Sequence, residues 1–463
     1  MSDRPIEPAG EEPSEDLPPE LAEVLKGLAG GQIDPAMASM FKEMGLGDVD
    51  PAMLKMVGAQ VQAMFADAST GPVNQAAATD LARKTVATQG DPSITAAQRH
   101  DTGQALDAAR LWLDAVTEFP AHDVGGTAWS RAEWVEATMP VWCDLVEPVA
   151  SGVSAAVTGV LSSQLGEMPL PEGVLPVGVD PAAAIAPMME RMSSGMFSMQ
   201  LGQAVGALAG DVLSGTEVAL PLVPHGQVVM LPTNIAAFAD GLGVDAGEVR
   251  LYLAVRESAR VRLYGAVPWL RSGLMAAVRD YARDISIDTD AIESTLQGAD
   301  MSDPAALQQA LQDNLFTPEP SSAQRAALGR LETLLALVEG WVDVVTDRAT
   351  AGKLPNAVAL GEAVRRRRAT GGPAERTFSS LVGLELRPRR LRDAANLWAA
   401  LEDRLGAEGR DAAWRHPDLA PSTADLDDVL GYVERAGGGA APDDMDAALD
   451  ALLREGDGDG SPA

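Results

Sequence analysis

The chain has 463 residues, of which 46% are hydrophobic, so it can bury a large core, and its 67 acidic and 35 basic residues leave a formal net charge of −32. This charge argues against a general affinity for nucleic acid or anionic membranes. The first twenty residues lack the basic start and apolar core of a signal peptide, and no apolar run reaches membrane-spanning length, so we expect a cytoplasmic protein with no membrane partner.

Composition divides the chain into four parts. Residues 1–20 are rich in Pro and Glu with little to bury, which predicts a disordered acidic N-terminus. Residues 21–77 hold short, Met-rich helical patterns and a linker, and such segments either dock on a partner or pack back onto the main body. Residues 78–436 predict one large helical domain, and residues 437–463 an acidic, mostly disordered tail.

Two local signals stand out among the helices of this domain. The helix after Ser130 opens with a capping box, in which Ser130 and Glu133 cover free N–H groups of the first turn. Farther along, Gly202, Gly206 and Gly210 recur every four residues on one helix. Glycines in this spacing expose the backbone, so they predict close packing against another helix of the same domain.

One stretch favours β-structure. Residues 217–222 and 227–231 flank the turn sequence Val-Pro-His-Gly, which predicts a β-hairpin. The remaining patterns are helical, so the fold class is mainly α, a large single helical domain with a small β-hairpin.

The stretch from Leu251 to Tyr264 predicts a helix that carries charge on its apolar side. On a 3.6-residue period, Arg256 and Arg260 fall in the middle of that side and Glu257 at its margin, while Tyr264 lies on the same side. An isolated buried charge is costly, so we expect both guanidiniums to point inward at carboxylates.

A second predicted helix, residues 331–345, supplies those carboxylates. It is apolar almost all round, except for a stripe of Glu332, Glu339 and Asp343 at i, i+7 and i+11. A helix of this kind belongs in a core. We therefore expect Arg260, together with Arg256, to pair with Glu339 and Asp343.

Residues 365–392 hold nine arginines against two glutamates. Such a run is able to bind phosphate or RNA. There is no regular interleaving of aromatic residues, however, and surplus carboxylates elsewhere in the chain can neutralise it. We expect no nucleic-acid partner.

Four long phrases of the sequence resemble the actinobacterial zincin-like metallopeptidase family, which is uncharacterised and is labelled zinc-dependent metalloprotease or hydrolase. They are LGQAVGALAGDVLSG (201–215), LYLAVRESARVRLYGAVPWLRSGL (251–274), LETLLALVEGWVDVV (331–345) and RRRRATGGPAERTFSSLVGLELRPRRLRDAANLW (365–398). The resemblance implies a pair of zincin-like core helices, a zinc cofactor and the hydrolysis of peptides.

A zincin site uses the pattern H-E-x-x-H, in which the histidines bind zinc and the glutamate activates the zinc-bound water. The matching positions here, 256–260, read R-E-S-A-R, and none of the four histidines lies at ligand spacing from another. The resemblance makes Glu257 the general base and Glu339 and Asp343 remnants of the metal site. An arginine has no lone pair for a metal, so we expect no zinc to be bound.

Three interpretations of the function remain open. Residue chemistry favours a catalytically impaired, metal-free family member that binds a peptide or protein partner. The family label favours an active metal-dependent peptidase with Glu257 as general base, although an all-oxygen site of Glu257, Glu339 and Asp343 suits magnesium or calcium better than zinc. The last treats the charges as ordinary core ion pairs and predicts no cleft beside Glu257. The sequence carries no signal for a particular oligomeric state.

Overall fold

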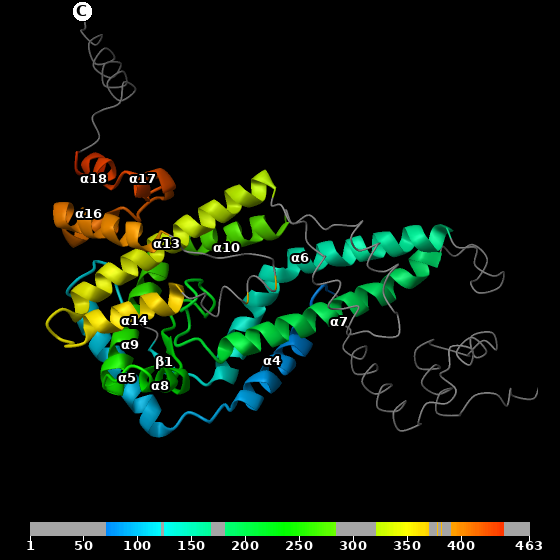
Figure 1. The fold of residues 1–463 in the computed structure, drawn as a ribbon, viewed down its shortest axis with the longest axis horizontal. Coiled ribbons are helices and arrows are strands. Elements are labelled where there is room, and N and C mark those ends of the chain that lie inside the picture. The colour runs from blue at the N-terminus through cyan, green and yellow to red at the C-terminus, as the bar shows by residue number, and fades with distance from the viewer. Residues whose placement is uncertain are drawn as a thin grey trace, which may run out of the picture.

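A computed structural model describes residues 71–121, 125–167, 181–283, 321–369, 377, 381 and 390–438, and helices dominate them (Figure 1). The predicted fold class, mainly α with a single helical domain, is confirmed. The helices are α4 (Gln75–Gln89), α5 (Ala96–Leu113), α6 (Arg131–Glu167), α7 (Pro181–Ala209), α8 (Pro232–Asp240), α9 (Ala246–Ala266), α10 (Pro268–Arg283), α13 (Ser322–Thr350), α14 (Ala357–Ala369), α16 (Leu391–Ala412), the 3-10 helix η2 (Pro417–Leu419), α17 (Thr423–Asp427) and α18 (Val429–Gly437).

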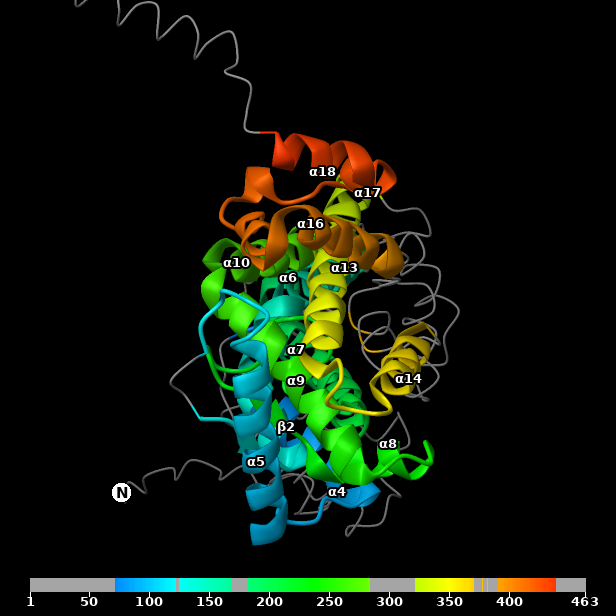
Figure 2. The ribbon, with the colours of Figure 1, turned by 90° about the vertical axis from the view of Figure 1, so that its left-hand side faces the viewer.

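Helices α9 and α13 form the centre of the fold, with α5, α10, α14 and α16 packed around them (Figure 2). Asp245 caps α9 by accepting hydrogen bonds from the N–H groups of Gly247 and Glu248. Pro268, which has no N–H to donate, begins α10 directly after α9 ends. Every residue of α9 from Tyr252 to Tyr264 is buried, so neighbours cover all of its sides and not only the apolar side expected from the sequence.

Helices α6 and α7 run side by side and project from the other described helices, with α4 against α7 (Figure 1). The capping box of Ser130 and Glu133 at the start of α6 is present. A Cβ added at Gly202 would lie 2.6 Å from the carbonyl oxygen of Ala78, and one at Gly206 would lie 2.9 Å from that of Ala82. The predicted close helix packing is confirmed, and its partner is α4.

The predicted β-hairpin is wrong. No residue from 217 to 222 lies in a strand, and strand β2 (Val229–Met230) pairs in parallel with β1 (Thr127–Ala128), far away in the sequence. Ser214 instead forms an antiparallel bridge to Met230. The physical reason is burial: every residue from 219 to 223 is buried, so this segment has no polar face to present to solvent as a half-exposed hairpin strand would.

Several sequence predictions fall elsewhere in the chain. The acidic N-terminus (1–20), most of the Met-rich segment (21–70), much of the arginine-rich run (370–376, 378–380 and 382–389) and nearly all of the acidic tail (439–463) lie outside the described residues. The domain limits at 78 and 436 therefore stay predictions, with α4 beginning at Gln75. None of the described helices is long and apolar enough to cross a membrane.

Candidate functional site

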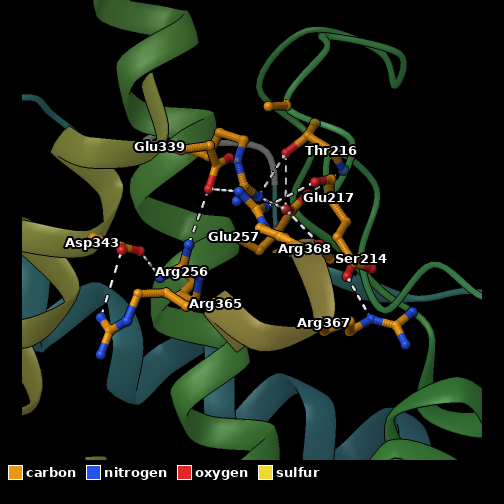
Figure 3. A network of polar contacts seen from close by, with 12 residues as sticks. Ser214, Thr216, Glu217, Arg256, Glu257, Glu339, Asp343, Arg365, Arg367 and Arg368 are labelled. Atoms are coloured by element: carbon orange, nitrogen blue, oxygen red, sulfur yellow. Dashed lines mark hydrogen bonds and ion pairs between the residues drawn. The ribbon is translucent and has the colours of Figure 1, made fainter. Parts of the chain in front are cut away.

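Three arginines and three carboxylates meet where α9, α13 and α14 come together (Figure 3). We call these six residues the ion-pair cluster. They are Arg256, Glu257 and Arg260 from α9, Glu339 and Asp343 from α13, and Arg368 from α14. The charges within the cluster balance, as burial requires.

Arg260 joins carboxylates on two helices. Its Nε lies 2.8 Å from Oε1 of Glu339, and its Nη1 lies 3.0 Å from Oε2 of Glu257. The side chain of Arg260 is only 2% exposed. The predicted pairing of Arg260 with Glu339 is confirmed.

Arg256 completes the contact between α9 and α13. Its Nη2 donates to Oε2 of Glu339 at 3.0 Å, and its Nη1 pairs with Asp343. Both inward arginines therefore have carboxylate partners, and the partner of Asp343 on α9 is Arg256.

Arg368 is the member of the cluster that the sequence analysis missed. Its Nη1 pairs with Oε2 of Glu339, so three guanidiniums surround this one carboxylate. A usable signal was present, because Arg368 follows the buried Leu360 and Val364 at i+8 and i+4 on one face of α14.

Neighbouring arginines of α14 are neutralised in the same way. Arg367 lies with its Nε 3.2 Å from Oε1 of Glu217, and Arg365 lies 3.7 Å from Oδ2 of Asp343 (Figure 3). The expectation that carboxylates from elsewhere in the chain would neutralise this part of the arginine run is confirmed.

Glu257 is completely buried and fully hydrogen-bonded. Its carboxylate accepts from the hydroxyl of Ser214 at 2.8 Å and from the N–H and hydroxyl of Thr216 at 2.9 and 2.8 Å, besides its ion pair with Arg260. Ser214 and Thr216 belong to the turn that follows α7. This turn covers the side of α9 on which Glu257 lies, so Glu257 is buried. The sequence pattern places Glu257 only at the margin of the buried side.

The two buried glutamates respond differently to this environment. Burial alone would raise the pKa of Glu339, but Arg260, Arg368 and Arg256 outweigh it and lower that pKa to about 2. Burial raises the pKa of Glu257, and Arg260, Ser214 and Thr216 only partly oppose the rise. Burial also disfavours the charge on Arg256 and Arg260, yet the neighbouring carboxylates raise both of their pKa values.

This donor set does not fit zinc. The two positions that would supply imidazoles carry guanidiniums, which stay cationic and have no lone pair to donate. The oxygens of Glu257, Glu339 and Asp343 instead face Arg256, Arg260 and Arg368. Across the described ranges, no three His, Cys, Asp or Glu side chains are grouped so that they could hold a metal ion.

Comparison with known proteins assigns the chain to a family. A sequence profile described as zincin-like metallopeptidase matches residues 73–433, which is most of the chain. The chain belongs to the zincin-like metallopeptidase family. A search of curated protein sequences gave no match.

A solved structure shares the fold of this family member. It comes from Chloroflexus aurantiacus and is described, provisionally, as a hydrolase with a novel fold. The two chains are 16% identical, with a TM-score of 0.54 over 79% of this chain and 99% of the other. At this identity the likeness concerns the fold alone.

The remaining predicted site residues lie near the cluster but outside it. Tyr264 is buried one turn beyond Arg260, and its hydroxyl donates to the carbonyl oxygen of Ala219. Glu332 is partly exposed on α13, two turns before Glu339 and therefore about 10 Å away along the helix axis.

Proposed function

We propose that this zincin-like family member is metal-free and catalytically impaired, and that its helical body binds a peptide or protein partner. The observation that supports the proposal is the position of Arg260. It sits where the family pattern has its second histidine, and it bridges the glutamate of the pattern to Glu339. A fixed cation thus holds together the carboxylates that a metal ion would otherwise hold.

The environment of Glu257 supports the same conclusion. A general base must reach the proton that it abstracts, directly or through one water. The carboxylate of Glu257 is 0% exposed and accepts from three protein donors in addition to its ion pair. Donors within the protein use the hydrogen-bonding capacity of this carboxylate. Glu257 therefore has a structural role, in which it holds Thr216 and Arg260 in position.

Family membership favours a second candidate, an active metal-dependent hydrolase. That activity would require Arg256, Arg260 and Arg368 to withdraw from Glu339 and leave its oxygens to a metal. Breaking a buried ion pair by moving one partner away costs about 3–5 kcal/mol, and here three pairs share one carboxylate. The cost makes this the weaker candidate.

Metal content of the purified protein tests the proposal. We expect native mass spectrometry after incubation with zinc to show the metal-free mass for the wild type, and the double variant R256H/R260H, which restores H-E-x-x-H, to gain one zinc. The variant R250H/R279H, which adds two histidines away from the cluster, is the control and should gain none. Stoichiometric zinc on the wild type, or peptidase activity that E257Q abolishes, would overturn the proposal.

A further inference from the structure

A small hollow lies next to the ion-pair cluster, and Thr216, which bonds Glu257, is one of its lining residues. Its walls include Thr216, Val223, Val261, Tyr264 and Arg271. Its volume of about 10 Å³ is close to what one water-sized group needs. It can therefore admit a single oxygen-bearing group, but not a folded segment.

Arg271 is the unusual residue of this hollow. It lies in the first turn of α10 and is half-buried, yet no side chain or carbonyl of the described residues forms an ion pair or hydrogen bond with its guanidinium. Burial lowers the pKa of Arg271, and Tyr264 alone acts against that fall. By contrast Arg262, on the preceding helix, pairs with Asp114 at 2.7 Å and donates to two carbonyl oxygens.

The rest of the wall mixes apolar and neutral polar side chains, and the hollow is partly open to solvent. Val223 and Val261 are buried, whereas Pro224 and His225 are exposed. No carboxylate is among the residues that line the hollow. A guanidinium offers five N–H donors in an arrangement that matches a carboxylate. The positive charge of Arg271 and the donors that it presents therefore favour the binding of an anionic oxygen.

We infer that this hollow takes one oxygen of a carboxylate carried on an apolar stem, with Arg271 as the cationic partner of that carboxylate. This carboxylate is the chemical group by which the partner in the proposed function is recognised, so the inference rests on that function. A phosphate fits less well, because its second charge would face one guanidinium in a protein of net charge −32.

Binding of small carboxylates to the full-length protein tests the inference. Calorimetric titration would compare each acid with its neutral amide. The first pair is butyrate and butyramide, and the second is the dipeptide acetyl-Ala-Val with a free C-terminal carboxylate and the same dipeptide with an amidated C-terminus. The first pair reports on a free organic acid and the second on a peptide C-terminus. The variants are R271Q, the charge-preserving R271K, and R279Q, which removes a partly exposed arginine two turns farther along α10.

We expect at least one carboxylate to bind about ten-fold more tightly than its neutral counterpart, as a charge-assisted hydrogen bond predicts. R271Q should remove that preference, R271K should keep part of it, and R279Q should keep it in full. Equal affinity for acid and amide, equal binding by R271Q and wild type, or no binding of either carboxylate would overturn the inference. Any of these results would leave the metal content unchanged, so failure here is distinguishable from failure of the proposed function.

Discussion

Arg260 contacts Glu257 on its own helix and Glu339 on α13 at the same time, at 3.0 and 2.8 Å. One side chain thereby ties the glutamate of the family pattern to the carboxylate that would serve as a metal ligand. Because all three side chains are at most 3% exposed, neither contact is screened by water.

The pairing of Arg260 with Glu339 should appear as a coupling energy. We expect R260M and E339Q each to lower the free energy of unfolding by about 3–5 kcal/mol, because R260M leaves the buried Glu257 without its ion pair and E339Q removes the charge that faces three guanidiniums. The double variant should lose less than the sum, with a coupling of about 1–3 kcal/mol in urea unfolding. The exposed pair Arg330–Asp280 is the control, and its coupling should stay below about 1 kcal/mol. Additive losses at Arg260 and Glu339 would show that the two side chains do not interact in solution.

The lowered pKa of Glu339 predicts a dependence of stability on pH. Its pKa is about 2 in the folded protein and about 4.3 in an unfolded chain, so its stabilisation is present above the unfolded value and is lost as the pH falls from about 5 toward 2. The full effect is of the order of 3 kcal/mol. The difference in unfolding free energy between wild type and E339Q should therefore shrink as the pH is lowered from 7 to 3.

The exposed carboxylate of Glu362 on α14 is the control for this titration. It bonds Arg365 and Arg366 at the surface, and E362Q should leave the stability almost unchanged across the same range. A difference between wild type and E339Q that stays constant with pH would mean that the guanidiniums do not lower the pKa of Glu339.

Arg368 should hold α14 against the core. We expect R368Q to speed amide hydrogen exchange in residues 357–369 about ten-fold, because the local opening of α14 no longer breaks the ion pair with Glu339. R366Q removes an arginine whose side chain is 77% exposed on the same helix and should leave the exchange unchanged. If both variants exchange at the wild-type rate, α14 is held by its apolar contacts alone.

The close approach of α7 to α4 predicts opposite effects for two glycine substitutions. G202A places a Cβ 2.6 Å from the carbonyl oxygen of Ala78, so we expect a loss of about 1–3 kcal/mol despite the better helix propensity of alanine. Gly329 on α13 has open space at the same position, so G329A should stabilise by up to about 1 kcal/mol. Thermal unfolding measures both, and a stabilised G202A would show that the two helices can move apart at little cost.

Sequence periodicity predicted the parts of this structure that depend on one helix at a time. Arg256 and Arg260 could be assigned to a buried face because that face is visible in the pattern of α9, and the carboxylates of α13 followed from the need to neutralise them. The spacing of Gly202, Gly206 and Gly210 likewise predicted a close helix contact, although it could not name α4 as the partner.

The parts that depend on distant segments could not be predicted in this way. Glu257 is buried because the turn holding Ser214 and Thr216 folds over it, and nothing in the pattern of α9 indicates that turn. The β-hairpin failed for the same reason, since Met230 pairs with Ala128, far away in the chain, and with Ser214, not with residues 217–222. Arg368 was obscured by the arginines beside it, which share its charge but face other partners.

The guanidiniums of the ion-pair cluster are covalently part of the helices that they join. The ion pairs of the cluster therefore form when α9, α13 and α14 come together, from side chains of these helices. If the protein is metal-free as proposed, chelating agents should remove no ion from these six residues, and the cluster should stay intact when a cell runs short of transition metals.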